Sequence, residues 1–192
     1  IINTVVTSKA LMAGGVIGQC DAEATSITNT GKVTFNGTAK TCIEAGGVIG
    51  RLAGNASDLL NENEITFAGS AEGSYITAGG VVGYNVGTHA LTNDGTYAAK
   101  NSGKITFKGY AKTNYHAGGV LGHNAIDLAT VLENSGEIIV SEEAQAAGSL
   151  YAGGVIGNTA KAVAVAEGKD YAAKNSGPLS FAGIAPSYYA GG

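Results

Sequence analysis

The chain has 192 residues, of which 44% are hydrophobic and 14% charged, with a formal net charge of −4. That hydrophobic share predicts a folded chain, while the acidic balance and the single arginine, Arg51, argue against nucleic acid as a partner. No apolar run approaches the roughly 18 residues needed to span a bilayer. The 31 glycines occur with only 2 prolines, which excludes collagen and proline-rich linkers.

A glycine motif organises the chain. Ala-Gly-Gly-Val-Ile-Gly or a close variant occupies residues 13–18, 45–50, 78–83, 117–122 and 152–157, and the chain ends in Ala-Gly-Gly. The motifs follow one another at spacings of 32, 33, 39, 35 and 38 residues. Such a period predicts a solenoid, a propeller or an array.

Residues 1–12 form a partial unit, and the first complete unit begins at residue 29 with the turn signal Asn-Thr-Gly. A strand is expected after each such turn, because residues 33–39 and their equivalents alternate apolar with polar side chains. One face then carries Val or Ile, Phe, Gly and Ala, and the other carries polar side chains. The aligned phenylalanines are Phe35, Phe67, Phe107 and Phe181, and the fourth unit departs from the pattern at residues 138–144.

A second strand is expected over each glycine motif. Two consecutive apolar residues follow each Gly-Gly, and because neighbours on a strand face opposite ways, one should point inward and the other outward. Glycine weakens a strand, so its repetition predicts a close approach to that backbone, by a bend, by a loop of the same chain or by a neighbouring molecule. The first glycines of the pairs are Gly14, Gly46, Gly79, Gly118 and Gly153.

With a third, less regular segment, each unit of 32–39 residues predicts three short strands and three turns. The expected fold is an all-β parallel β-solenoid (β-helix) of about five coils, stacked about 4.8 Å apart. Residues 1–192 then form one continuous body, which we interpret as a fragment or processed form of a longer repeat chain. The phenylalanines and first glycines should form ladders, and Cys20 and Cys42 form either one disulfide or two buried thiols.

The run Asn-Ser-Gly-x-Ile-Thr-Phe-x-Gly-x-Ala, followed by Tyr-x-Ala-Gly-Gly-Val-Leu-Gly, resembles the GLUG-type repeats of bacterial surface proteins. Residues 118–122 and four sister segments match their Gly-Gly-Leu-Val-Gly core, with Val where that family commonly has Leu. The resemblance covers nearly the whole chain. It implies a secreted or surface-anchored bacterial stalk or adhesin, and it implies no catalytic residues.

Several residues are of types found in metal, phosphate or catalytic sites, but none of them completes such a site. His116 and His123 flank one glycine motif, but they do not recur and lack a third metal ligand, so with His89 we interpret them as surface side chains. Residues 93–95 lack the calcium-loop pattern, and the glycine motif lacks the Gly-Lys-Ser/Thr ending of a phosphate loop. The acidic pair at residues 142–143 lies on opposite strand faces, unlike paired glycosidase carboxylates. We therefore expect no enzyme, no metal site and no cofactor.

Two rows of side chains are candidates for contact with a ligand or with another subunit. The tyrosines near the glycine motifs are expected to fill the core or a corner, or to form an aromatic stripe that binds carbohydrate or protein. These are Tyr75, Tyr115, Tyr151 and Tyr188. The valines after Gly-Gly, or the row beside them, should form an apolar strip that another segment or another subunit covers. These are Val16, Val48, Val81, Val120 and Val155.

The function expected from these patterns is that of an extracellular structural or adhesive repeat protein, which forms a filament, a sheath or a surface stalk. Its coils would stack and pack side by side, and open strand edges at both ends would favour self-association. A glycan or a host surface protein is a further candidate partner. The alternative is a carbohydrate-binding or carbohydrate-active β-helix, which requires carboxylates and aromatics that break the repeat on adjacent coils.

Overall fold

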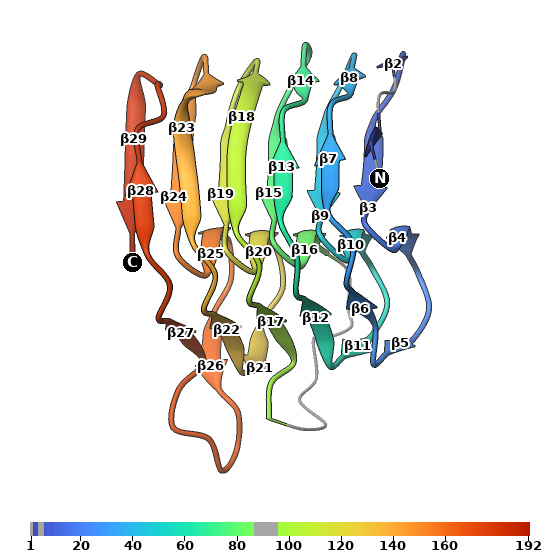
Figure 1. Ribbon diagram of the computed structural model, residues 1–192, viewed down its shortest axis with the longest axis vertical. Helices are drawn as coiled ribbons and strands as arrows, with labels where there is room; N and C mark the ends of the chain where they lie inside the picture. The colour runs from blue at the N-terminus through green and yellow to red at the C-terminus, as the bar shows by residue number, and fades with distance from the viewer. Residues whose placement is uncertain (1, 4–5, 87–95) are drawn as a thin grey trace.

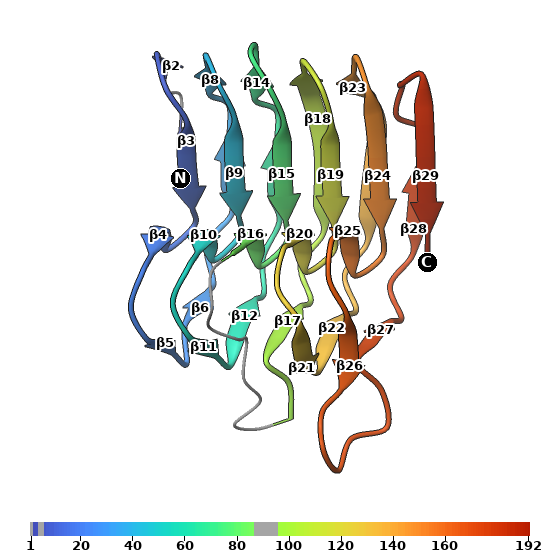
Figure 2. The ribbon, with the colours of Figure 1, turned by 180° about the vertical axis from the view of Figure 1, so that it is seen from behind.

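The computed structural model describes residues 2–3, 6–86 and 96–192. The described residues form strands and no helix, and the strands pair in parallel with their equivalents in neighbouring coils. Figure 1 shows the coils side by side in chain order, and Figure 2 shows the same stack from behind. The fold is the parallel β-solenoid of about five turns that the repeat spacing predicts.

Each coil begins in a sheet that carries the phenylalanines, here called the Phe sheet. Its strands are β1 (Ile2–Asn3), β7 (Val33–Phe35), β13 (Ile65–Phe67), β18 (Ile105–Ala111), β23 (Ile138–Ala146) and β28 (Leu179–Phe181). The shorter strands β2 (Val6–Thr7), β8 (Thr38–Ala39) and β14 (Ser70–Ala71) extend the same sheet.

The glycine motif contributes to two sheets. The Gly sheet contains β3 (Leu11–Gly14), β9 (Ile43–Gly46), β15 (Ile76–Gly79), β19 (Tyr115–Gly118), β24 (Ser149–Gly153) and β29 (Ser187–Gly191). The chain then turns into the return sheet, made of β4 (Ile17–Cys20), β10 (Ile49–Leu52), β16 (Val82–Asn85), β20 (Leu121–Asn124) and β25 (Ile156–Thr159).

The coil closes through short strands. Two outer pairs are formed by β5 (Ala24–Thr25) with β11 (Ala56–Ser57), and by β21 (Leu128–Thr130) with β26 (Val163–Val165). The Asn sheet contains β6 (Thr28–Asn29), β12 (Leu59–Asn61), β17 (Ala99–Asn101), β22 (Leu132–Asn134) and β27 (Ala173–Asn175). The coil is therefore more finely divided than the three strands expected, since β7 to β12 all lie between two successive asparagine turns.

The aligned residues stand next to one another in successive coils. Phe35 stacks on Phe67 with ring centroids 5.2 Å apart, and Phe67 stacks on Phe107 at 5.3 Å. Val140 takes the next position, and Phe181 follows it in register. The first glycines also pair in sequence from Gly14 through Gly46, Gly79 and Gly118 to Gly153. These ladders follow from the repeat alignment alone.

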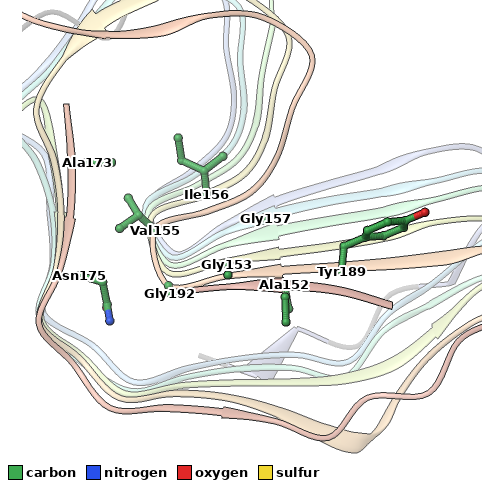
Figure 3. Close-up of a pocket in the computed structure, with 12 residues that line it drawn as sticks. Ala152, Gly153, Val155, Ile156, Gly157, Ala173, Asn175, Tyr189 and Gly192 are labelled. Carbon is green, nitrogen blue, oxygen red and sulfur yellow. The ribbon is translucent and has the colours of Figure 1, made fainter. Parts of the chain in front are cut away.

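The coil encloses two separate apolar cores. One lies between the Phe sheet and the Gly sheet and includes Phe67, Phe107 and Tyr115. The other lies among the return sheet, the outer pairs and the Asn sheet and includes Val81, Leu121 and Leu132. Figure 3 shows this division at the last glycine motif, where Ala152 points to one side and Val155 and Ile156 point to the other.

A close approach at the Gly-Gly corner separates the two cores. A Cβ on Gly79 would lie 2.0 Å from the carbonyl oxygen of Val82, so only glycine allows the chain to turn so sharply. A Cβ on Gly80 would lie 2.2 Å from the carbonyl oxygen of Gly119 and 3.1 Å from Cγ of Asn101. The second glycine therefore lets the corner contact Asn101 of the Asn sheet, a segment of the same chain, as one of the alternatives from the sequence predicts.

Ion pairs join neighbouring coils along the outside. Lys32 pairs with Glu64 at 2.7 Å, Lys104 pairs with Glu137 at 2.8 Å, and Lys108 pairs with Glu143 at 2.9 Å. In each pair the lysine precedes the glutamate by one coil. These pairs are largely exposed, so each contributes little stability, but together they favour one register.

Candidate functional site

The richest cluster of polar and aromatic side chains lies where the Gly sheet and the return sheet face each other on their outer sides, here called the seam. The Gly sheet contributes Met12, Glu44, Thr77, His116, Tyr151 and Tyr189, and the return sheet contributes Gln19, Arg51, Tyr84, His123 and Asn158. Figure 3 shows Tyr189 on the face of the Gly sheet opposite to Ala152, outside the core.

The glycine motif itself brings these rows together. A Cβ on Gly83, the last glycine of its motif, would lie 2.5 Å from both the backbone nitrogen and the carbonyl oxygen of Ala45. The two sheets therefore touch backbone to backbone at this point. Side chains one residue further from the turn face each other across the seam, as Glu44 and Arg51 do in one coil and His116 and His123 do in another.

One end of the seam holds a buried ion pair. Glu44 is only 1% exposed, and its carboxylate accepts two hydrogen bonds from Nη1 of Arg51, at 2.9 and 3.0 Å. The hydroxyl of Tyr75 donates a third hydrogen bond to the same carboxylate at 2.9 Å. The guanidinium of Arg51 also lies 5.3 Å from the ring centroid of Tyr84, within range of a cation–π interaction.

This network raises the pKa values of Tyr75 and Arg51. Burial and the charge of Glu44 raise the pKa of Tyr75, so its hydroxyl stays protonated and donates to the carboxylate. Burial lowers the pKa of Arg51, but the hydrogen bond and charge of Glu44 outweigh that effect and raise it overall. The carboxylate and the guanidinium therefore neutralise each other inside the seam.

The middle of the seam holds two stacked histidines. The rings of His116 and His123 lie 4.9 Å apart at an angle of 25°, and Tyr151 meets His116 edge-on at 5.0 Å. Burial, together with His123, lowers the pKa of His116 to about 3, and burial also lowers the pKa of His123. The expectation of a solvated surface side chain is therefore wrong for His116, because the bend at the glycines folds one sheet over the other, while His123 is partly exposed.

Two neighbouring polar groups in the seam have no hydrogen-bond partner among the described protein atoms. They are Oγ1 of Thr77 and both ring nitrogens of His116, and the two residues are adjacent in register. Thr77 is 1% exposed and His116 is 8% exposed. Buried polar groups normally find partners, so these atoms point to a water molecule or to a hydroxyl group of a ligand.

The seam also breaks the repeat. On the outer face of the Phe sheet, three successive coils carry Thr34, Thr66 and Thr106 at one position. In the seam, the equivalent positions of successive coils carry unlike side chains: an acid, a hydroxyl, an imidazole and a phenol along one row. The spacing of the repeats gives no sign that these two rows face each other.

The predicted tyrosine stripe divides between two environments. Tyr115 is fully buried in the first core, where its hydroxyl donates to the carbonyl oxygen of Lys108 at 2.9 Å, and Tyr188 continues that inward row in register. Tyr75 and Tyr151 contact the seam instead. The four side chains therefore do not form one stripe. Tyr115 and Tyr188 lie two residues before the alanine of their motif, whereas Tyr75 lies three and Tyr151 one residue before it.

The predicted valine strip is not a free surface. Val48, Val81 and Val120 are fully buried in the second core, and Val155 is 8% exposed; Val16, in the first coil, is exposed. The apolar residues next to them, such as Ile49, are buried as well. The expectation of one inward and one outward residue was wrong, because the turn after Gly-Gly directs both into the second core, where the same chain covers them.

The remaining candidates lie apart from the seam. His89 and residues 93–95 fall outside the described residues. The acidic pair Glu142 and Glu143 is exposed on β23, where Glu143 pairs with Lys108. Cys20 and Cys42 are buried free thiols, which decides between the two alternatives left by the sequence.

A pocket of about 380 Å³ lies at the end of the second core, bordered by Gly154, Val155, Asn175 and Gly192 (Figure 3). It forms where the Gly sheet has a sixth strand and the return sheet has five. Its lining combines backbone atoms and apolar side chains with the side chains of Asn175 and Tyr189.

Comparisons with family models, with curated proteins and with solved structures gave no match. The resemblance to GLUG-type repeats stays a prediction. In the part of the chain that the structure describes, no helix could cross a membrane. Among the same residues, no three His, Cys, Asp or Glu side chains gather where they could hold a metal ion.

Proposed function

We propose that this chain is a structural and adhesive segment of an extracellular or cell-surface repeat protein, and that it is not an enzyme. Its coils form a rod, and the rod is lengthened by further coils or by end-to-end association of chains. The observation that carries this proposal is the parallel register of the Gly and Asn sheets, which runs unbroken from coil to coil.

Contacts between successive coils support a rod. Equivalent strands pair in parallel from each coil to the next, and stacked phenylalanines and hydrogen-bonded asparagines continue through several coils. Each coil is therefore stabilised by its nearest neighbours, as in other solenoids.

Electron microscopy and sedimentation velocity over a range of protein concentrations test self-association. We expect elongated particles whose length grows with concentration along the solenoid axis. The variant Val155→Glu places a carboxylate in the end pocket, and we expect it to shorten the particles. The control Val165→Glu lies at an exposed position outside that pocket and should leave particle length unchanged. A compact monomer at the highest concentration would contradict end-to-end association.

A second candidate function is carbohydrate binding, which the seam favours. Its rows combine tyrosines, histidines, an amide and an ion pair on adjacent coils, and this is the break in the repeat that such a protein requires. Incubation with polysaccharides separates the candidates: retention without turnover supports an adhesive role, and release of shorter sugars would contradict the non-enzymatic proposal.

A further inference from the structure

The seam has the features of a recognition site within an otherwise uniform rod. Tyr84, His123 and Asn158 follow one another on adjacent coils of the return sheet, and each is partly exposed. A ligand that ran along the solenoid axis would meet a different side chain at every coil. The threonine ladder of the Phe sheet offers no such distinction, so the chemistry of the seam is what could select a partner.

The charge balance of the seam argues for an uncharged ligand. Arg51 and Glu44 already neutralise each other, and Tyr75 donates to the same carboxylate. The lowered pKa values of His116 and His123 keep both imidazoles neutral near pH 7. A neutral imidazole presents one donor and one acceptor, which is the same pairing that a hydroxyl group offers.

The unpartnered atoms mark where such a hydroxyl would bind. Oγ1 of Thr77 and the ring nitrogens of His116 are adjacent in register, and His123, itself partly exposed, stacks over His116. A ligand could reach this position only if the side chain of His123, which stacks on His116 and is partly exposed, moves aside. A hydroxyl placed there would satisfy groups whose burial without a partner is costly.

We propose that the seam binds a neutral, hydroxyl-rich polysaccharide that lies along the solenoid axis, with one hydroxyl bound between Thr77 and His116. Coils repeat about every 4.8 Å, close to the advance of one sugar ring in an extended β-linked chain. Successive sugars would therefore meet Tyr84, His123 and Asn158 in turn. This proposal rests on the adhesive part of the proposed function and names its ligand class.

Isothermal titration of the 192-residue chain with defined oligosaccharides tests it. The neutral probes are cellohexaose, xylohexaose and laminarihexaose, and the acidic probe is hexagalacturonate. We expect at least one neutral probe to bind and the acidic probe to bind more weakly. If no neutral probe binds, or if the acidic probe binds more tightly, the proposal is wrong.

A matched pair of substitutions locates the site. Thr77→Val keeps the shape of the side chain but removes the hydroxyl, and it should weaken binding about fivefold to tenfold. Thr66→Val makes the same change on the outer face of the Phe sheet, away from the seam, and should leave binding unchanged. Equal effects of the two substitutions would overturn the assignment.

The same variant separates this proposal from the structural one. Thr77 does not border the end pocket, so particle length in electron microscopy should be the same for Thr77→Val and the parent chain. If the chain forms rods but binds no neutral probe, only the proposed polysaccharide site is contradicted. A chain that binds a neutral probe but stays a compact monomer contradicts end-to-end association alone.

Discussion

The side-chain amide of Asn101 donates a hydrogen bond to Oδ1 of Asn134 in the next coil, with the two atoms 2.7 Å apart. The same amide nitrogen donates to the carbonyl oxygen of Gly103 at 2.8 Å, and Oδ1 of Asn101 accepts from Asn61 at 2.7 Å. The ladder continues in both directions, to Asn29 and to Asn175. Each buried amide is therefore satisfied only if its neighbours in both adjacent coils are in register.

Removal of one central member should be costly. Asn101→Ala leaves a donor of Asn61, an acceptor of Asn134 and the carbonyl of Gly103 buried without their partner, so we expect a loss of about 3 kcal/mol in the free energy of unfolding. Urea denaturation followed by circular dichroism measures it. Asn175→Ala, at the half-buried end of the ladder, is the control and should cost less than half as much. Equal losses would show that the ladder is not cooperative.

The ladders could be predicted from sequence because they depend only on position within the repeat. Phe67 and Gly79 recur at fixed places, and parallel stacking puts equal positions side by side. The seam could not be predicted in this way. Thr77 and His116 look like outward residues of an ordinary strand, and their burial depends on how sharply the chain turns at Gly-Gly. That angle follows from backbone contacts that no alignment of the repeat contains.

The turn itself can be tested at one glycine. Gly79→Ala would place a Cβ 2.0 Å from the carbonyl oxygen of Val82 and 2.7 Å from that of Val120. Both contacts are with backbone atoms, which cannot move without breaking the register, so we expect a loss of about 3 kcal/mol or more. Gly191 occupies the equivalent motif position in the last coil, where a Cβ would have no atom within 4 Å. Gly191→Ala should therefore be tolerated, and thermal denaturation of the two variants would reveal any failure of this distinction.

The buried imidazole of His116 predicts how stability depends on pH. Its pKa in the folded chain is about 3, because of burial and His123, against 6.5 for an ordinary histidine. Between these values the unfolded chain binds the additional proton, so stability is highest above about pH 6.5 and falls by about 1.4 kcal/mol per unit as the pH decreases. His116→Phe keeps a ring between His123 and Tyr151 but removes the titration. Chemical denaturation at several pH values should show that the free energy of unfolding depends less steeply on pH in the variant than in the parent chain. The same dependence in both chains would contradict the burial of a neutral imidazole.

Arg51 tests whether the buried ion pair stabilises the seam more than the exposed pairs stabilise the outer surface. Arg51→Met keeps much of the apolar length of the side chain. It leaves the carboxylate of Glu44, which is 1% exposed, with the hydrogen bond from the Tyr75 hydroxyl. An uncompensated buried charge is strongly unfavourable, so we expect a loss of about 3 kcal/mol in the free energy of unfolding.

The matched control is Lys104→Met, which breaks a 2.8 Å pair with Glu137 whose two side chains are both more than one-third exposed. Water solvates the remaining carboxylate there, so the loss should stay below about 1 kcal/mol. The double variant Arg51→Met with Glu44→Gln completes the comparison, because removing both charges should recover part of the lost stability. If Arg51→Met costs no more than Lys104→Met in urea denaturation, Glu44 must be solvated in the folded chain, and the two sheets do not close over it as described.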